Sequence, residues 1–166
     1  MTQKITAIDA DDALKIALQC AMDMNAFYCK ASSLIDDGDA KAIFSGLAEK
    51  HLKTKARLIR AYSQVSGKKI LYLQLGKKHR LNTLLPCPDS VEELFPVVEK
   101  NETEVSNFFM MISRRLFSAE VRNLFRELAL ECEQHIAILE ASFAPQPDED
   151  EGVEKRNSFS VIADTD

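Results

Sequence analysis

The sequence predicts an all-α fold, a four-helix bundle made of two repeated helical hairpins joined by a long crossover. Helix-breaking residues are rare, with five glycines and five prolines among 166 residues. Apolar residues recur at helical spacing. Residues 17–58 and 98–139 also align without a gap, 81 positions apart. The chain is 46% apolar, and we expect one domain, 1–144, followed by a tail, 145–166.

The repeat matters because two hairpins related by a pseudo-twofold axis bring equivalent positions of four helices to one central place. Function is therefore sought there first. The aligned pairs are Phe27-Tyr28 with Phe108-Phe109, Ile43-Phe44 with Leu124-Phe125, and Leu47-Ala48 with Leu128-Ala129.

The first hairpin is expected to consist of helices at about 9–35 and 40–63. Asp9 or Asp11 can accept hydrogen bonds from the free amides of the first turn. The cluster at 36–39, Asp-Asp-Gly-Asp, ends the first helix and caps the second. Such a short connection makes the two helices antiparallel.

The second hairpin is expected at about 90–117 and 118–143. Ser90 and Glu93 form a capping-box pattern, and Pro96 should kink the third helix or separate its first turn. Ser118 can cap the fourth helix. The connection 64–89 contains an apolar run at 70–75 that we expect to lie along the bundle as extended chain, so that the second and third helices run parallel.

Composition argues against several functions. The net charge is −5 and the acidic tail accounts for it, so the body is near neutral and we expect no nucleic-acid binding. No apolar run is long enough to span a bilayer, and we expect a cytoplasmic protein that binds no membrane.

The four cysteines show no Cys-x-x-Cys spacing. Cys20 and Cys29 are expected to be ordinary core or surface residues, and Cys87 an exposed loop thiol.

Four polar residues fall on the apolar faces of the predicted helices: His51, Glu102, Cys132 and His135. A buried carboxylate without a partner costs several kcal/mol, so Glu102 needs a cation, a hydrogen-bond donor or a metal. Cys132 and His135 lie on one side of one helical turn. In the repeat, Cys132 aligns with His51, and both helices face the centre at the same level.

The spacing resembles the rubrerythrin-type branch of the ferritin-like superfamily. In that family, two helices each supply a glutamate seven residues before an aromatic residue, and two supply Leu-Ala-x-x-Glu-x-x-His. Here the glutamate-type segments are 21–28 and 102–109, and the others are Leu47-Ala48-Glu49-Lys50-His51-Leu52-Lys53-Thr54 and Leu128-Ala129-Leu130-Glu131-Cys132-Glu133-Gln134-His135.

The resemblance implies a metal site at Glu102 and His135, with His51 and Cys132 in place of two bridging glutamates. Ala21 and Thr54 stand where a second metal would find its glutamate and histidine. Alanine cannot ligate and threonine replaces imidazole poorly, so di-iron peroxidase or ferroxidase activity is not expected. The remaining donors suit one zinc or iron ion. The resemblance also implies a context of iron handling or oxidative stress.

Other interpretations stay open. Glu102 and His135 can be a buried ion pair in a metal-free interaction scaffold. Such a scaffold would act through homodimerisation of the bundle and a protein partner for the acidic tail. An enzyme with Cys132 as nucleophile and His135 as base has the right residue types, although a thiol at mid-bundle has no evident access for substrate.

Overall fold

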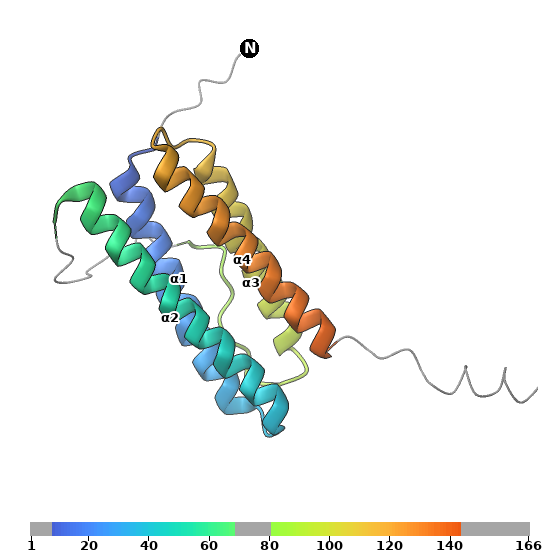
Figure 1. Cartoon of the computed structure of the whole chain (residues 1–166). Coiled ribbons are helices and arrows are strands. Elements are labelled where there is room, and N and C mark those ends of the chain that lie inside the picture. Colours follow the sequence, from blue (N-terminus) through green and yellow to red (C-terminus); the bar gives the residue numbers. More distant parts are fainter. Residues whose placement is uncertain (1–7, 69–80, 144–166) are drawn as a thin grey trace, which may run out of the picture.

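The computed structural model describes residues 8–68 and 81–143. They form four helices, α1 (Ala10–Leu34), α2 (Gly38–Ser66), α3 (Leu94–Ser113) and α4 (Ala119–Phe143). α1 packs closely along α2 and α3 along α4, while fewer contacts, α1 with α3 and α2 with α4, join the two hairpins (Figure 1). The all-α bundle of two hairpins is confirmed.

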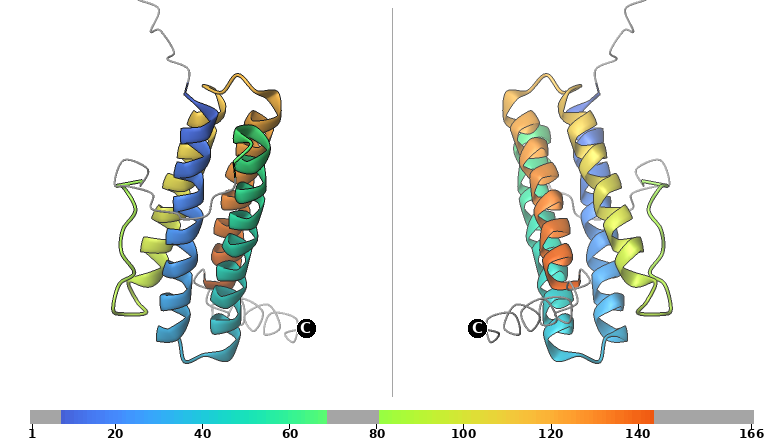
Figure 2. Two further views of the ribbon diagram at one scale, coloured as in Figure 1. Left: turned by 90° about the vertical axis from the view of Figure 1, so that its left-hand side faces the viewer. Right: turned by 90° about the vertical axis from the view of Figure 1, so that its right-hand side faces the viewer.

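The connection between the hairpins gives the bundle a topology that differs from a simple up-down-up-down bundle. α2 ends at one end of the bundle and α3 begins at the other, so these two helices run in the same direction (Figure 1). The described part of the connection, from residue 81 onward, lies on the side formed by α1 and α3 (Figure 2). The apolar run at 70–75 and the tail, 145–166, lie outside the described residues, so their expected conformations are untested.

Three of the expected helix starts have the expected caps. The Asp9 carboxylate accepts a hydrogen bond from the amide of Asp11, at 3.2 Å. Asp37 does the same for two amides at the start of α2. The Ser118 hydroxyl accepts from the amide of Val121 at 3.4 Å. These contacts satisfy amides that have no partner inside the helix.

The third helix differs from expectation at both ends. It begins at Leu94 rather than near residue 90, and Glu93 makes no capping hydrogen bond, so the capping box was wrong. Pro96 then falls in the first turn, where a missing amide costs no hydrogen bond. The helix ends at Ser113, and the turn that follows buries Leu116 while leaving Phe117 86% exposed.

The sequence repeat is visible as repeated contacts. The Asn25 amide donates to the carbonyl of Ala48 at 2.8 Å. The Ser106 hydroxyl donates to the carbonyl of Ala129 at 3.1 Å. Each bond joins the two helices of one hairpin, and the second pair lies 81 positions after the first. Two aromatic contacts obey the same relation, Tyr28 with Phe44 (centroids 5.8 Å apart) and Phe109 with Phe125 (5.7 Å).

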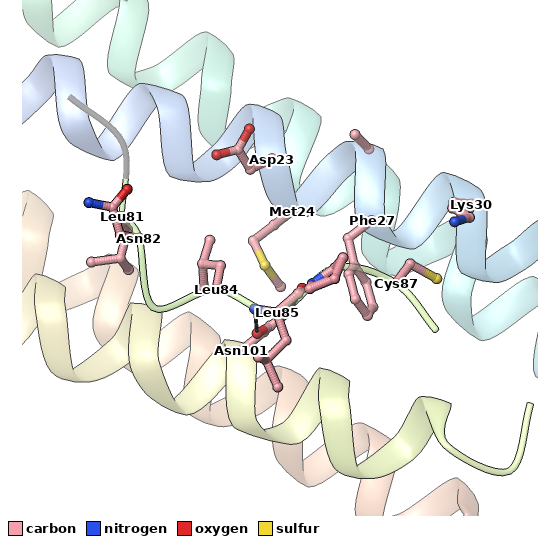
Figure 3. Close-up of a pocket in the computed structure, with 12 residues that line it drawn as sticks. Asp23, Met24, Phe27, Lys30, Leu81, Asn82, Leu84, Leu85, Cys87 and Asn101 are labelled. Atoms are coloured by element: carbon pink, nitrogen blue, oxygen red, sulfur yellow. Dashed lines mark hydrogen bonds between the residues drawn. The ribbon is translucent and has the colours of Figure 1, made fainter. Parts of the chain in front are cut away.

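A buried asparagine fixes the connection against the bundle. The Asn101 side chain accepts from the amide of Leu85 and donates to its carbonyl, both at 2.8 Å (Figure 3). A groove of about 510 Å³ lies between α1, this segment and α3. Cys87, expected to be exposed, is partly buried and lines this groove, because the segment lies against α1 instead of standing away from it.

Candidate metal centre

The centre of the bundle is organised around one carboxylate oxygen. Glu102 on α3 is fully buried, and its Oε1 lies 2.5 Å from the hydroxyl of Tyr28, which donates to it. The same oxygen lies 3.0 Å from His51 Nε2 and 3.2 Å from His135 Nδ1. Each of the four helices therefore contributes one polar side chain to a single point.

Ring packing holds the two imidazoles in place. The Tyr28 ring stacks on His51, with centroids 5.4 Å apart and an interplanar angle of 19°. His51 and His135 meet edge to face, with centroids 5.0 Å apart. Both histidines are only 4% exposed. Because His51 is packed between Tyr28 and His135, its ring cannot turn freely and its nitrogen stays directed at Glu102.

The surroundings keep Glu102 ionised. Burial alone raises the pKa of a carboxyl group, but hydrogen bonds from His135 and His51, with their charges, outweigh burial and hold the pKa of Glu102 well below its ordinary value. Burial raises the pKa of Tyr28 well above its usual range, and the nearby Glu102 charge raises it further. Tyr28 thus remains a donor and Glu102 an acceptor.

The second oxygen of this carboxylate is unsatisfied. Glu102 Oε2 is buried and accepts no hydrogen bond of normal geometry from the described residues. A buried polar atom without a partner costs roughly 1–3 kcal/mol or more when charged. The Cys132 thiol also interacts with this carboxylate, and because a thiol is only a weak donor, Glu102 retains capacity to bind a cation.

Three of the four predicted residues come together. Ligand atoms of His51, Glu102 and His135 all lie within 4.8 Å of one another, and all three residues are buried. Cys132 is also buried, and its sulfur is not among those grouped atoms. Burial raises the pKa of the Cys132 thiol well above its usual range, and the negative charge of Glu102 raises it further.

A cavity of about 10 Å³ borders the site. His51, His135 and Cys132 line it, and so do Ala21 and Thr54, the positions where the resemblance implies lost ligands. Cys20, expected to be an ordinary core or surface residue, is buried and also lines this cavity. α1 turns Cys20 toward the bundle centre next to Ala21, and burial raises its pKa to about 12.

Sequence reasoning missed the role of Tyr28, which it used only as an aligned aromatic position of the repeat. A signal was present in the repeat. Tyr28 aligns with Phe109, so the two halves differ there by a hydroxyl group, and Ala21 aligns with Glu102. The phenol of one half therefore faces the acid of the other half.

No protein-family model matches the chain, and no curated protein sequence matches it. A solved structure of a hypothetical protein from Pyrococcus furiosus is similar in fold, with a TM-score of 0.65 and 22% sequence identity. The match covers 82% of this chain and 89% of the other. This similarity supports the four-helix fold alone. Among the described residues, no helix is both long and apolar enough to cross a membrane.

Proposed function

We propose that this protein binds one transition metal ion, zinc or iron(II), at His51, Glu102 and His135, with Cys132 as the fourth ligand. The observation that carries the proposal is the convergence of two imidazoles and a buried carboxylate from three helices, with ligand atoms within 4.8 Å of one another. A metal cation bound there would compensate the buried negative charge of Glu102.

The separations fit a metal. With bonds of about 2.0–2.1 Å to nitrogen and oxygen, the ligand atoms of a tetrahedral ion lie about 3.3–3.4 Å apart. Glu102 Oε1 lies 3.0 and 3.2 Å from the two imidazole nitrogens. A metal bound there would take the place of the protons on those nitrogens, and the ligand atoms, which span up to 4.8 Å, would have to move closer together. Tyr28 would then orient the carboxylate by a hydrogen bond from outside the ligand set.

Cys132 completes the ligand set in this proposal. Without metal its raised pKa keeps the thiol protonated. A bound cation deprotonates a coordinating thiol outright, so metal uptake should release a proton from Cys132. Two imidazoles, a carboxylate and a thiolate favour zinc or iron(II) over magnesium or calcium, which prefer oxygen ligands.

The proposal includes a ferritin-like architecture of the rubrerythrin type without di-iron chemistry. Three features support it: the two hairpins, the parallel direction of α2 and α3, and one candidate ligand each from α2, α3 and α4 at the middle of the bundle. Ala21 and Thr54 supply no second ligand set, which argues against peroxidase or ferroxidase activity. Iron handling or oxidative-stress response is the proposed context. The homodimer and a protein partner for the tail are further proposals.

Cobalt(II) titration of the metal-free full-length protein tests this function. Cobalt(II) reports coordination geometry by its visible absorption, and thiolate ligation adds a charge-transfer band. We expect saturation at about one equivalent, with release of the Cys132 thiol proton and of each imidazolium proton that the metal displaces. Glu102→Gln and His135→Gln should weaken binding by more than about 100-fold, beyond the usual effect of an outer-shell change. Cys132→Ser should abolish the charge-transfer band.

Matched variants separate ligation from general damage. His79 is the third histidine of the chain and Cys29 is an exposed cysteine. His79→Gln and Cys29→Ser should bind cobalt like the parent protein. If the parent binds no more cobalt than Glu102→Gln does, the cluster is a metal-free hydrogen-bond network and the proposal is wrong.

A further inference from the structure

The second half of α2 carries a concentration of positive charge that the metal site does not use. From Lys50 to Ser66 the helix has five lysines and arginines and no acidic residue. Four of these cations follow helical spacing and therefore lie on one face of α2, where they form what we call the basic stripe: Lys50, Lys53, Arg57 and Arg60.

Most of the basic stripe is open to solvent. Lys50 and Arg60 are exposed, and neither forms an ion pair with an acid in the part of the chain that the structure describes. The Lys53 side chain is 73% exposed, and its pair with an acid of the same helix is 3.6 Å long. Arg57 is the exception, because it pairs with two glutamates of α4. Since exposed ion pairs contribute little, three of the four cations are available to another partner.

A pocket of about 270 Å³ between α2 and α4 adjoins the arginines of the basic stripe. Its apolar lining consists of Ala61, Val65, Val121 and Leu124, and both arginines and one glutamate line it as well. Val65 is 46% exposed, so the pocket leaves apolar surface uncovered. Cations beside such a pocket suit a peptide segment that combines several carboxylates with an apolar side chain.

The chain beyond α4 starts close to α2. The rings of Phe44 and Phe143 are in contact, with centroids 5.6 Å apart, at the end of the bundle where α2 begins and α4 ends (Figure 1). From that level Lys53 and Arg60 lie about 14 and 24 Å further along α2. An extended chain reaches at most about 3.3 Å per residue, so the run Asp148–Glu151 can lie up to about 17 to 26 Å from Phe143. The acidic run can therefore come level with the basic stripe.

We propose that the C-terminal segment Asp148–Val153 of this chain docks on its own bundle, with carboxylates on the basic stripe and Val153 at the adjoining pocket. This segment lies outside the described residues. Its sequence has four consecutive acids followed by Gly152 and Val153, which complements the cations and the apolar pocket in charge and order. Tethering beside the surface gives a high effective concentration, which compensates for weak single ion pairs. The proposal does not depend on the metal site.

Trypsin digestion of the full-length protein tests the docking, because Lys155 and Arg156 directly follow the docked segment. Proteolysis follows the population of the open form, so the parent should be cut there about tenfold more slowly at low salt than Lys53→Glu/Arg60→Glu. At roughly 0.5 M salt, where exposed charges are screened, the two proteins should be cut equally. Intact mass identifies the cleavage site.

Matched variants show whether the two surfaces act on each other. Asp148→Asn/Asp150→Asn should speed cleavage as much as the stripe variant, and combining both sets should add little, because each removes the same interaction. Lys100→Glu changes an exposed lysine of α3, and Asp164→Asn/Asp166→Asn changes acids beyond the segment. Both controls should be cut like the parent.

Carbodiimide cross-linking of the parent identifies the occupant, since it joins amines and carboxylates that are in contact. We expect links from Lys50 or Lys53 to Asp148–Glu151 within the monomer, with the link from Lys53 to Glu49 as internal standard. Links to Lys100 at equal yield would contradict the proposal, and links found only in dimers would assign the stripe to a second copy and overturn it.

The digestion also has outcomes that overturn the proposal. Equal cleavage of the parent and the stripe variant at low salt would show that the segment does not dock. Equal cleavage together with duplex DNA binding that only the parent shows would assign the stripe to a nucleic acid instead.

Discussion

At the scale of the residue, Glu102 is the group on which the site depends. A fully buried glutamate would normally be replaced by an apolar residue or would take up a proton. Here three donors converge on Oε1, while Oε2 accepts no hydrogen bond of normal geometry from the part of the chain that the structure describes. The arrangement keeps a negative charge in the core, in contact with two imidazoles.

Tyr28→Phe tests how much the phenol contributes. Removing a hydrogen bond to a charged group costs about 2 kcal/mol, so the metal-free protein should lose about that much free energy of unfolding. Loss of an outer-shell donor should also weaken metal binding by about tenfold. Chemical denaturation and cobalt titration measure the two effects. Tyr62→Phe, at another buried tyrosine, is the control, and equal effects in both variants would contradict the assigned role.

The pH dependence of stability tests the ionisation of Glu102. Its pKa in the folded protein lies below the ordinary glutamate value of 4.5, so folding favours the charged form. The resulting stabilisation is present above pH 4.5 and is lost as the pH falls through the folded pKa. With a chelator present, the parent should therefore lose free energy of unfolding relative to Glu102→Gln below about pH 4.5. A difference that stays constant across this range would contradict the account.

At the scale of the element, each hairpin is held by the same polar contact. Asn25→Ala and Ser106→Ala should each lower the free energy of unfolding by about 1 kcal/mol, because each removes a hydrogen bond between the two helices of one hairpin. Thermal and urea denaturation measure this. Ser142→Ala is the control, since its hydroxyl bonds only within α4, and it should change stability little. Unequal effects of Asn25→Ala and Ser106→Ala, with one near zero, would show that the hairpins are not energetically equivalent.

The sequence predicted the elements well where the local signal is strong. Asp9, Asp37 and Ser118 cap helices because short polar side chains satisfy free amides regardless of distant packing. The capping box predicted at Ser90 and Glu93 does not form. Where this helix begins depends also on Pro96 and on the path of the connection before it, and these outweigh the local pattern. The backbone of Leu85 is hydrogen-bonded to the side chain of Asn101. This tertiary contact could not be predicted, because no local pattern in the sequence indicates it.

At the scale of the whole molecule, the repeat was the most useful guide to the site. It correctly brought His51, Glu102 and His135 together, because equivalent faces of the two hairpins must meet at the centre. It could not give the direction of each side chain, so it missed the donation by Tyr28 and the position of Cys20 at the cavity. Side-chain orientation depends on the rotation of each helix about its axis, which packing decides.

Metal binding should also link to folding, since the ligands come from α2, α3 and α4 and are together only in the folded bundle. An anomalous-diffraction experiment on crystals of the protein grown with iron(II) or zinc tests the central claim most directly. The account predicts one anomalous peak between His51, Glu102 and His135, about 2.0–2.3 Å from their ligand atoms. The same crystals with no peak there, and with the imidazoles still hydrogen-bonded to Glu102, would contradict it.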